Sequence, residues 1–339
     1  VRDSVIEEVS SVIADFNSDG KDDLFLGTAG GDFFGQSAPL LDRYFVQGED
    51  RFSQNELPEY YEHASVVKPH DIDGDGDLDL FVGNYTRTNN FGIIPPSYIL
   101  RNDDGAFVIL ENESIQSLGL ITDAHWADLD GDQQEELVIV GEWMTPRFFK
   151  NNKGSLSEVD LLKEAISGLW QAVVPNDIDG DGDLDLILGN WGNNNKFKAS
   201  QKYPLKMYYG DFDSNGSTET VVAIPKDGQY YPLESLQGLS GQMENLRKKF
   251  NTYRSMAGKT IEEILDKKAL KKGKLYEVNE LRSGILMNEG KLSFVPFERD
   301  LQLSPITAFL SYDFDKDGRE EVLAGGNYFG VKPYHGRFG

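Results

Sequence analysis

Short apolar runs recur along the chain, each directly after a nine-residue acidic segment. Other apolar pairs lie just before these segments, as at Val12–Ile13, Val66–Val67 and Val173–Val174. Short apolar runs rich in β-branched residues are typical of buried strands. The pattern therefore predicts a repeated unit of strand, acidic loop and strand. The runs that follow the loops are LFLG from Leu24, LFVG from Leu80, LVIVG from Leu137, LILG from Leu186, VVA from Val221 and VLAG from Val322.

A second repeated element is a hairpin that turns over Asn and Gly. It occurs as LRNDDGAF at 100–107, FKNNKGSL at 149–156 and LMNEGKL at 286–292, with a looser version, YFVQGEDRF, at 44–52. Asn and Gly accept the left-handed backbone conformations that tight turns need. Together the two elements give four short strands in roughly 50 residues, which is typical of a β-propeller blade.

The net charge lies in the acidic loops. The 339 residues carry a formal charge of −24, and the six loops hold 27 acidic residues against 3 basic ones, so that 30 of each remain elsewhere. Like charges at 4 Å repel by roughly 1 kcal/mol per pair even in water, and more near a protein surface. We therefore expect a bound counter-charge, and a divalent cation supplies it most simply.

The spacing inside the loops favours calcium. Oxygen-bearing side chains recur at loop positions 1, 3, 5 and 9, a backbone carbonyl is expected from position 7, and Gly stands at position 6 in five of the six loops. Carboxylate and carbonyl oxygens in a flexible loop suit Ca²⁺ better than transition metals. About six structural calcium ions are expected. The predicted ligands are Asp15, Asn17, Asp19, Lys21 and Asp23; Asp71, Asp73, Asp75, Asp77 and Asp79; Asp128, Asp130, Asp132, Gln134 and Glu136; Asp177, Asp179, Asp181, Asp183 and Asp185; Asp211, Asp213, Asn215, Ser217 and Glu219; and Asp313, Asp315, Asp317, Arg319 and Glu321.

Two loops depart from the pattern. Gln133 replaces Gly at position 6 of the third loop, which predicts a more strained or weaker site. The fifth loop has only three acids and Asn215 at position 5, so an ordinary solvated turn without a metal is the alternative interpretation for this loop. An EF-hand is disfavoured for all six, because position 12 is apolar or small and strands, not helices, flank each loop.

The loops and the Gly-terminated strands resemble the FG-GAP/VCBS repeats of integrin α-subunit propellers. The segments LITDAHW at 120–126, VGEWMTPRFFKN at 140–151 and DLDLILGNWGNNN at 183–195 resemble more closely the bacterial proteins related to cartilage acidic protein, which are often associated with an ASPIC/UnbV domain. The resemblance implies an all-β, integrin-α-like propeller that is calcium-bound, exported and non-enzymatic. No ASPIC/UnbV segment is visible, and the chain has no Cys.

The whole chain, residues 1–339, is expected to be one propeller domain. The resemblance implies seven blades, with six as the alternative. Only six loops are present, so a seventh blade would lack the motif, be shared between the termini or lie beyond Gly339. The interval from Asp177 to Asp211 is 34 residues and has no Asn/Gly hairpin, so this blade is expected to be abbreviated.

The long interval before the sixth loop contains the one non-β element. Apolar residues recur at helical spacing, and Thr260 with Glu263 has the form of a capping box, so 238–273 is predicted to be a helical hairpin inserted in one blade. Ten basic residues against three acidic ones lie between Arg247 and Lys274. This patch is either a partner surface, with Arg247, Lys248, Lys249 and Arg254 as candidates, or a solvated helix face.

A Gly-Asn-aromatic sequence ends several of the strands that follow the loops. It places Tyr85, Trp191 and Tyr328 at equivalent positions, where they could form a partner-binding platform or pack between blades.

The predicted function is a calcium-stabilised interaction module for a protein or a glycan, secreted or in an assembly at the cell surface, most simply the bacterial outer surface. The alternative is a polysaccharide-processing hydrolase or lyase on the same scaffold, but no catalytic residue can be named and none is expected. Net acidity argues against a nucleic-acid partner. No transmembrane segment is predicted, because no stretch approaches 18 consecutive apolar residues.

Overall fold

The fold is all-β and is built mainly of four-stranded antiparallel sheets. The computed structural model describes residues 5–110 and 112–327. Sheet 1 consists of β1 (Glu7–Ala14), β2 (Asp23–Ala29), β3 (Arg43–Gln47) and β4 (Phe52–Asn55). Sheet 2 consists of β5 (Ala64–His70), β6 (Asp79–Asn84), β7 (Tyr98–Arg101) and β8 (Val108–Leu110). In both, each strand pairs with the next one along the chain, so the predicted order of loop hairpin and Asn/Gly hairpin is confirmed.

Sheet 3 repeats this order with one added strand. It consists of β9 (Leu120–Ala127), β10 (Glu136–Met144), β11 (Arg147–Asn152) and β12 (Ser155–Val159), and the short β13 (Gly168–Leu169) also pairs with β10. Sheet 4 consists of β14 (Ala172–Asn176), β15 (Asp185–Gly189), β20 (Gly284–Asn288) and β21 (Leu292–Pro296). Sheet 5 contains β22 (Ala308–Tyr312) and β23 (Glu321–Gly325). Short 3₁₀ helices lie at Ala38–Leu40, Glu113–Ile115 and Arg299–Gln302.

The prediction of an abbreviated fourth blade is wrong. Sheet 4 is complete, but its third strand follows its second only after a long insertion, and Leu286 of β20 pairs directly with Leu186 of β15. The insertion contains a sheet of its own. This inserted sheet has the order β18-β17-β16-β19, from β16 (Leu205–Gly210), β17 (Glu219–Lys226), β18 (Gln229–Pro232) and β19 (Lys274–Val278).

The segment predicted as a helical hairpin is helical, but it does not form two helices. The segment forms five short helices, because new N-caps arise at Ser235, Thr252, Thr260 and Asp266 and the chain becomes extended between them. The predicted capping box is present, with the backbone N–H of Thr260 donating to Glu263 Oε2 at 2.8 Å. The helices are α1 (Leu236–Gln242), α2 (Asn245–Lys249), α3 (Tyr253–Met256), α4 (Ile261–Ile264) and α5 (Lys267–Lys272).

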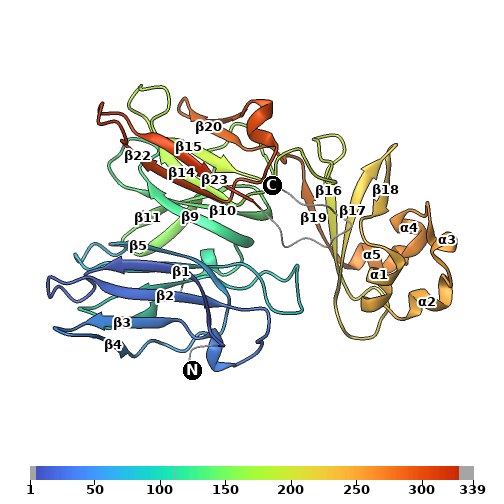
Figure 1. Cartoon of the computed structure of the whole chain (residues 1–339), viewed down its shortest axis with the longest axis horizontal. Coiled ribbons are helices and arrows are strands. Elements are labelled where there is room, and N and C mark those ends of the chain that lie inside the picture. Colours follow the sequence, from blue (N-terminus) through green and yellow to red (C-terminus); the bar gives the residue numbers. More distant parts are fainter. Residues whose placement is uncertain (1–4, 111, 328–339) are drawn as a thin grey trace.

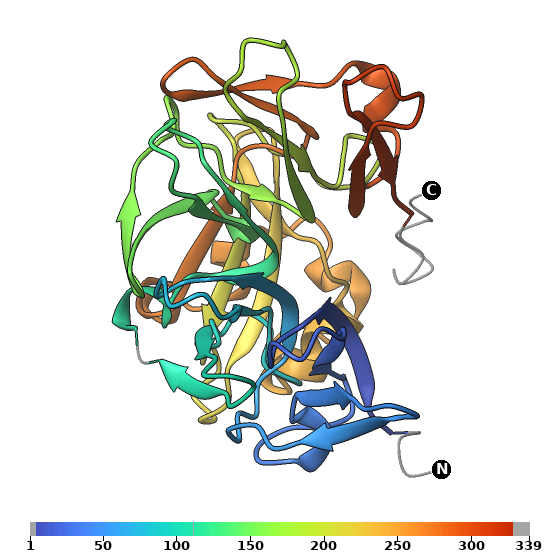
Figure 2. The same cartoon turned by 90° about the vertical axis from the view of Figure 1, so that its left-hand side faces the viewer.

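Sheets 1 to 5 follow one another in an arc, with the inserted sheet and its helices to one side (Figures 1 and 2). The first strands of successive sheets contact each other, β1 with β5, β5 with β9, β9 with β14 and β14 with β22. This arrangement is consistent with a propeller-like fold. The described sheets are open, so the number of blades stays a prediction.

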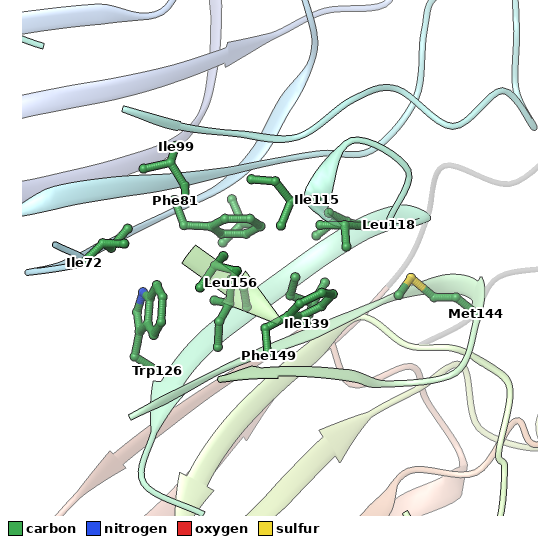
Figure 3. Close-up of a cluster of buried hydrophobic side chains, with 14 residues drawn as sticks. Ile72, Phe81, Ile99, Ile115, Leu118, Trp126, Ile139, Met144, Phe149 and Leu156 are labelled. Carbon is green, nitrogen blue, oxygen red and sulfur yellow. The ribbon is translucent and has the colours of Figure 1, made fainter. Parts of the chain in front are cut away.

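The core is divided among the spaces between neighbouring sheets. In β6, Leu80 and Val82 pack toward sheet 1, whereas Phe81 packs toward sheet 3 with Ile139 and other residues of Figure 3. Successive residues of a strand point to opposite faces, so a strand covered on both faces must be apolar throughout. This explains the uninterrupted apolar runs after the loops.

Candidate metal loops

Each acidic loop connects two consecutive antiparallel strands of one sheet. Loops one to four lie between β1 and β2, β5 and β6, β9 and β10, and β14 and β15; loop five lies between β16 and β17, and loop six between β22 and β23. Loop five therefore belongs to the inserted sheet and not to the arc. The predicted strand–loop–strand unit is present in all six copies.

The first carboxylate of each loop binds the loop's own backbone. In loop two, Asp71 Oδ1 accepts from the N–H of Gly74 at 2.8 Å and of Asp75 at 3.1 Å, and Oδ2 accepts from Gly76 N–H at 3.1 Å. Gly76 has φ +102°, as the turn requires. In loop three Gln133 adopts φ +68° at the same position, a left-handed conformation that is unfavourable for a residue with a side chain. This agrees with the strain predicted there.

The ninth-position carboxylate joins the loop to its sheet. Asp79 Oδ2 accepts from Ile72 N–H at 2.9 Å, and its Oδ1 accepts from Asn102 N–H at 2.7 Å. Burial raises the pKa of Asp79 to about 6, and it raises the pKa of Glu136 and Glu219 as well. Taking such a carboxylate out of water is costly unless a cation or further donors compensate it.

Five of the six loops bring three or four carboxylates within 4.8 Å of one another. Loop one is not among them in the described part of the chain, and it has Asn17 and Lys21 where other loops carry acids. In loops two, three, five and six the ninth-position acid belongs to the cluster, whereas in loop four Asp181 takes its place. The clusters are Asp71, Asp73 and Asp79; Asp128, Asp130 and Glu136; Asp177, Asp179 and Asp181; Asp211, Asp213 and Glu219; and Asp313, Asp315, Asp317 and Glu321.

Loop five, the weakest copy by sequence, has a buried oxygen without a partner. Glu219 is only 2% exposed, and its Oε2 accepts from Phe212 N–H at 2.7 Å. Its Oε1 is buried and makes no hydrogen bond, although it belongs to a side chain clustered with Asp211 and Asp213. An unsatisfied buried carboxylate oxygen is costly. A hard cation fits these residues, because it would bind this oxygen together with the two aspartates.

Loop three differs because a lysine reaches its carboxylates. Lys150 of β11 forms ion pairs with Asp130, with Asp132 at 3.0 Å and with Glu136 at 3.7 Å. Its hydrogen bonds to Asp130 and Asp132 raise the pKa of the ammonium group, and the same contact lowers the pKa of Asp132. This contact could not be predicted from the loop motif, because Lys150 lies 18 residues beyond Asp132.

The hairpin asparagines tie loops one, two and three to the next sheet. Asn102 Nδ2 donates to the carbonyl of Phe16 in loop one at 2.7 Å, and its Oδ1 accepts from Gly105 N–H at 2.8 Å in its own turn. Asn151 donates in the same way to loop two at 2.8 Å, and Asn288 to loop three at 2.8 Å. The sequence predicted these asparagines only as turn residues. Their recurrence in every tight hairpin was the available signal.

Two of the aromatic partner candidates surround a buried glutamate. Glu142 accepts from the Tyr85 hydroxyl at 2.7 Å, from Gln171 Nε2 at 2.8 Å and from Trp191 Nε1 at 3.2 Å, which joins sheets 2, 3 and 4. Burial raises the pKa of Glu142. Tyr85 and Trp191 are half-buried and also pack against an apolar cluster that includes Leu205 of the inserted sheet. These contacts favour packing over a binding platform. Tyr328 lies outside the described residues.

The basic candidates of the insertion are on its surface. Arg247, Lys248, Lys249 and Arg254 are all exposed. Lys249 Nζ donates to two backbone carbonyls, whose oxygens lie at 2.8 and 2.9 Å, and Arg247 Nε donates to Ser240 Oγ at 3.2 Å. The patch is therefore an exposed, positively charged surface on short helices, and its partner-binding role stays a prediction.

Two adjoining clefts lie beside sheets 1 and 2, with volumes of about 560 and 650 Å³, and the larger one also reaches Thr218 and Thr220 at the start of the inserted sheet's β17. His63, Arg87 and Asn90 are among the residues that line both. Arg87 forms an ion pair with the buried Glu62, and burial lowers the pKa of His63. These clefts could not be predicted from the sequence, because their walls come from segments that lie far apart in the chain.

Comparison with known families supports the repeat. The FG-GAP-like repeat family matches residues 71–139 and 128–188, which contain loops two to four. The chain therefore contains FG-GAP-like repeats, as the resemblance predicted. The match is to a repeat family and is consistent with an interaction module. No curated protein matches.

Among solved structures, the chain is similar to the V. cholerae biofilm matrix protein Bap1. The identity is 11%, the TM-score is 0.29, and the alignment covers 95% of this chain and 77% of Bap1. A likeness this weak carries no functional argument. Among the described residues, none of the helices has the length and apolar character needed to cross a membrane.

Proposed function

We propose that the protein is a calcium-stabilised, propeller-like interaction module that works outside the cell. The proposal includes the single propeller domain of residues 1–339, seven blades and a relationship to the bacterial ASPIC/UnbV-associated proteins. It is supported by FG-GAP-like repeats and by loops whose first and ninth carboxylates are held in place by backbone N–H groups. Calcium, when bound, supplies the positive charge that these loops lack.

The observation that carries the calcium proposal is Glu219. A buried carboxylate with one unbonded oxygen, beside two aspartates, destabilises the fold when no counter-charge is present. A bound cation would remove this cost. The predicted ligands in the other loops extend the proposal to about six sites. Loop six offers a four-carboxylate cluster, although its Glu321 is exposed.

The expected affinity supports an extracellular location. Extracellular calcium modules bind at roughly 10⁻⁴–10⁻³ M. Sites this weak would be empty at cytosolic calcium concentrations. At a tenfold excess over Kd each site adds about 1.4 kcal/mol to the free energy of unfolding. Several such sites would rival the whole stability of a domain, about 5–15 kcal/mol.

The partner surface that we propose is the basic side of the inserted helices. The rest of the chain is neutral or acidic, and Arg247, Lys248, Lys249 and Arg254 are exposed together. Tyr85 and Trp191 are engaged with Glu142, which leaves the insertion as the more accessible candidate. An anionic glycan or an acidic protein surface fits such a patch.

The test is a thermal melt of the whole chain with and without excess EGTA, paired with metal analysis of the purified protein. We expect several bound calcium ions per chain and a Tm lowered by many degrees in EGTA, because the loop charges then repel each other. Magnesium at the same ionic strength is the control for general screening. Absence of bound calcium together with an unchanged melt would mean that the loops are only acidic turns.

A further inference from the structure

We propose that Lys150 is the resident cation of loop three and keeps calcium out of this one loop. The inference rests on the proposed function, since it assumes that the other loops bind calcium. Six equivalent calcium sites are then no longer expected. In loop three the lysine neutralises the carboxylates, and the calcium sites are in the other loops.

The position of Lys150 follows from the strand register. Phe149 of β11 pairs with Leu137 of β10, so the next residue, Lys150, lies opposite Glu136, the ninth residue of loop three. From there its ammonium group forms ion pairs with Asp130, Asp132 and Glu136 together. Two of these, Asp130 and Glu136, are also members of the loop-three carboxylate cluster.

A tethered ammonium competes well with a free ion. Its local concentration is set by the strand that carries it and does not depend on the calcium concentration outside. A divalent cation that entered the same cluster would meet the positive charge of Lys150 at close range, and a repulsion of this kind is strong near a protein surface. Loop three would have to expel the lysine before calcium could bind.

The neighbouring sheets provide the matched comparison. Leu100 pairs with Leu80, which places Arg101 opposite Asp79 in sheet 2, at the position that Lys150 has in sheet 3. No ion pair joins Arg101 to the loop-two carboxylates among the residues that the structure describes. The same register places the uncharged Met287 opposite Asp185 in sheet 4. A basic residue at this position is therefore not sufficient, and the contact with the carboxylates is particular to loop three.

The experiment is equilibrium dialysis of the whole chain against calcium chloride, with the bound metal counted for the wild type and four variants. Lys150→Gln is expected to bind one more calcium per chain than the wild type. Lys150→Arg, which keeps the charge, and Arg101→Gln, the matched control, are expected to keep the wild-type number. Asp130→Asn, with Lys150 intact, should also leave the number unchanged.

The outcomes separate this inference from the proposed function. Equal, non-zero numbers for the wild type and Lys150→Gln, or one calcium fewer in Asp130→Asn, overturn the role of Lys150 alone. Zero calcium in the wild type and in all variants overturns the proposed function and this inference with it. The Asp130→Asn measurement keeps the question decidable if Lys150→Gln does not fold.

Discussion

The sheets of the arc and the inserted sheet carry the same kind of acidic loop, but the two kinds of sheet are attached to their neighbours by different contacts. In the arc, the asparagine of a following hairpin donates to the preceding loop, as Asn102 does to the carbonyl of Phe16 at 2.7 Å. The inserted sheet is attached by a tyrosine, since Tyr209 donates its hydroxyl to Asn90 Oδ1 at 2.7 Å. The loop itself therefore does not determine where its strand pair lies.

The faces of the sheets differ in the same way. Sheets 2, 3 and 4 of the arc have a neighbouring sheet on each face, and Leu80 and Phe81 point to opposite neighbours. On one face of the inserted sheet, Val221 and Ala223 pack instead against the short helices, through Leu239 and Ile264. A strand pair joined by this acidic loop can thus occur in two architectures. Its position depends on what covers its faces and on the side chains that link it to its neighbours.

The largest expected effect comes from the glutamate that joins three sheets of the arc. Glu142→Ala removes the carboxylate that accepts from Tyr85, Gln171 and Trp191 in a buried site. We expect a loss of about 4 kcal/mol in the free energy of unfolding, measured by urea denaturation. Glu277→Ala, which removes an exposed ion pair of the inserted sheet, should cost less than about 1 kcal/mol. Equal losses would contradict the difference between the regions.

Glu142→Gln tests the charge of this site separately. The folded-state pKa of Glu142 is raised by burial above its ordinary value of 4.5, so the folded protein takes up the proton first as the pH falls. The wild type should therefore gain stability relative to Glu142→Gln between neutral pH and about 4.5. The measurement is a urea denaturation series in EGTA across this range. A pH-independent difference would show that the carboxylate is not held in an unfavourable charged state.

The next effect is on the links within the arc. Asn102 is fully buried, and Asn102→Ala removes both its bond to loop one and the bond that holds its own turn. We expect a loss of about 3 kcal/mol, because the carbonyl of Phe16 also loses its donor. The exposed Asn55→Ala in the same arc is the control and should change stability by less than about 0.5 kcal/mol. If Asn102→Ala also stays within that range, the asparagine link is not structural.

Calcium should act on loops in both regions, with a smaller effect per site. Asp73 Oδ1 and Asp213 Oδ1 each accept from the backbone two residues later at 3.2 Å, which makes Asp73→Ala and Asp213→Ala a matched pair. Each substitution is expected to cost about 1.4 kcal/mol in millimolar calcium and little in EGTA. Thermal melts under both conditions give the values. A loss that is the same with and without calcium would indicate a purely structural aspartate.

The sequence predicted the repeated hairpins well because each is a local pattern. Each acidic loop, each Asn and Gly turn and each apolar run is a motif of no more than about ten residues. All six loops connect strands as predicted. What could not be predicted was long-range order. The 34-residue interval after Asp177 indicates a short blade when read linearly, whereas Leu286 returns to complete sheet 4 after the insertion.

The prediction of two helices in the insertion differed from the structure for another reason. The apolar residues of this segment do have helical spacing, and they form the core between the inserted sheet and the helices. However, several capping residues in succession, such as Thr252 and Asp266, each begin a new helix and so end the previous one. Periodicity predicts which residues are buried, but the capping residues decide how many helices result.

The smallest expected effect tests the attachment of the inserted sheet. Tyr209→Phe removes the hydroxyl that donates to Asn90 and accepts from Thr218 at 3.2 Å, while the ring stays in place. We expect a loss of about 1 kcal/mol, and faster hydrogen exchange in β16 and β17 than in the arc. Because this hydroxyl lies between the inserted sheet and the segment of Asn90, its loss should loosen the insertion locally, while the apolar cluster of Leu205 and Val278 keeps the sheet attached. Equal acceleration in sheets 1 to 4 would instead mean that the insertion and the arc unfold as one unit.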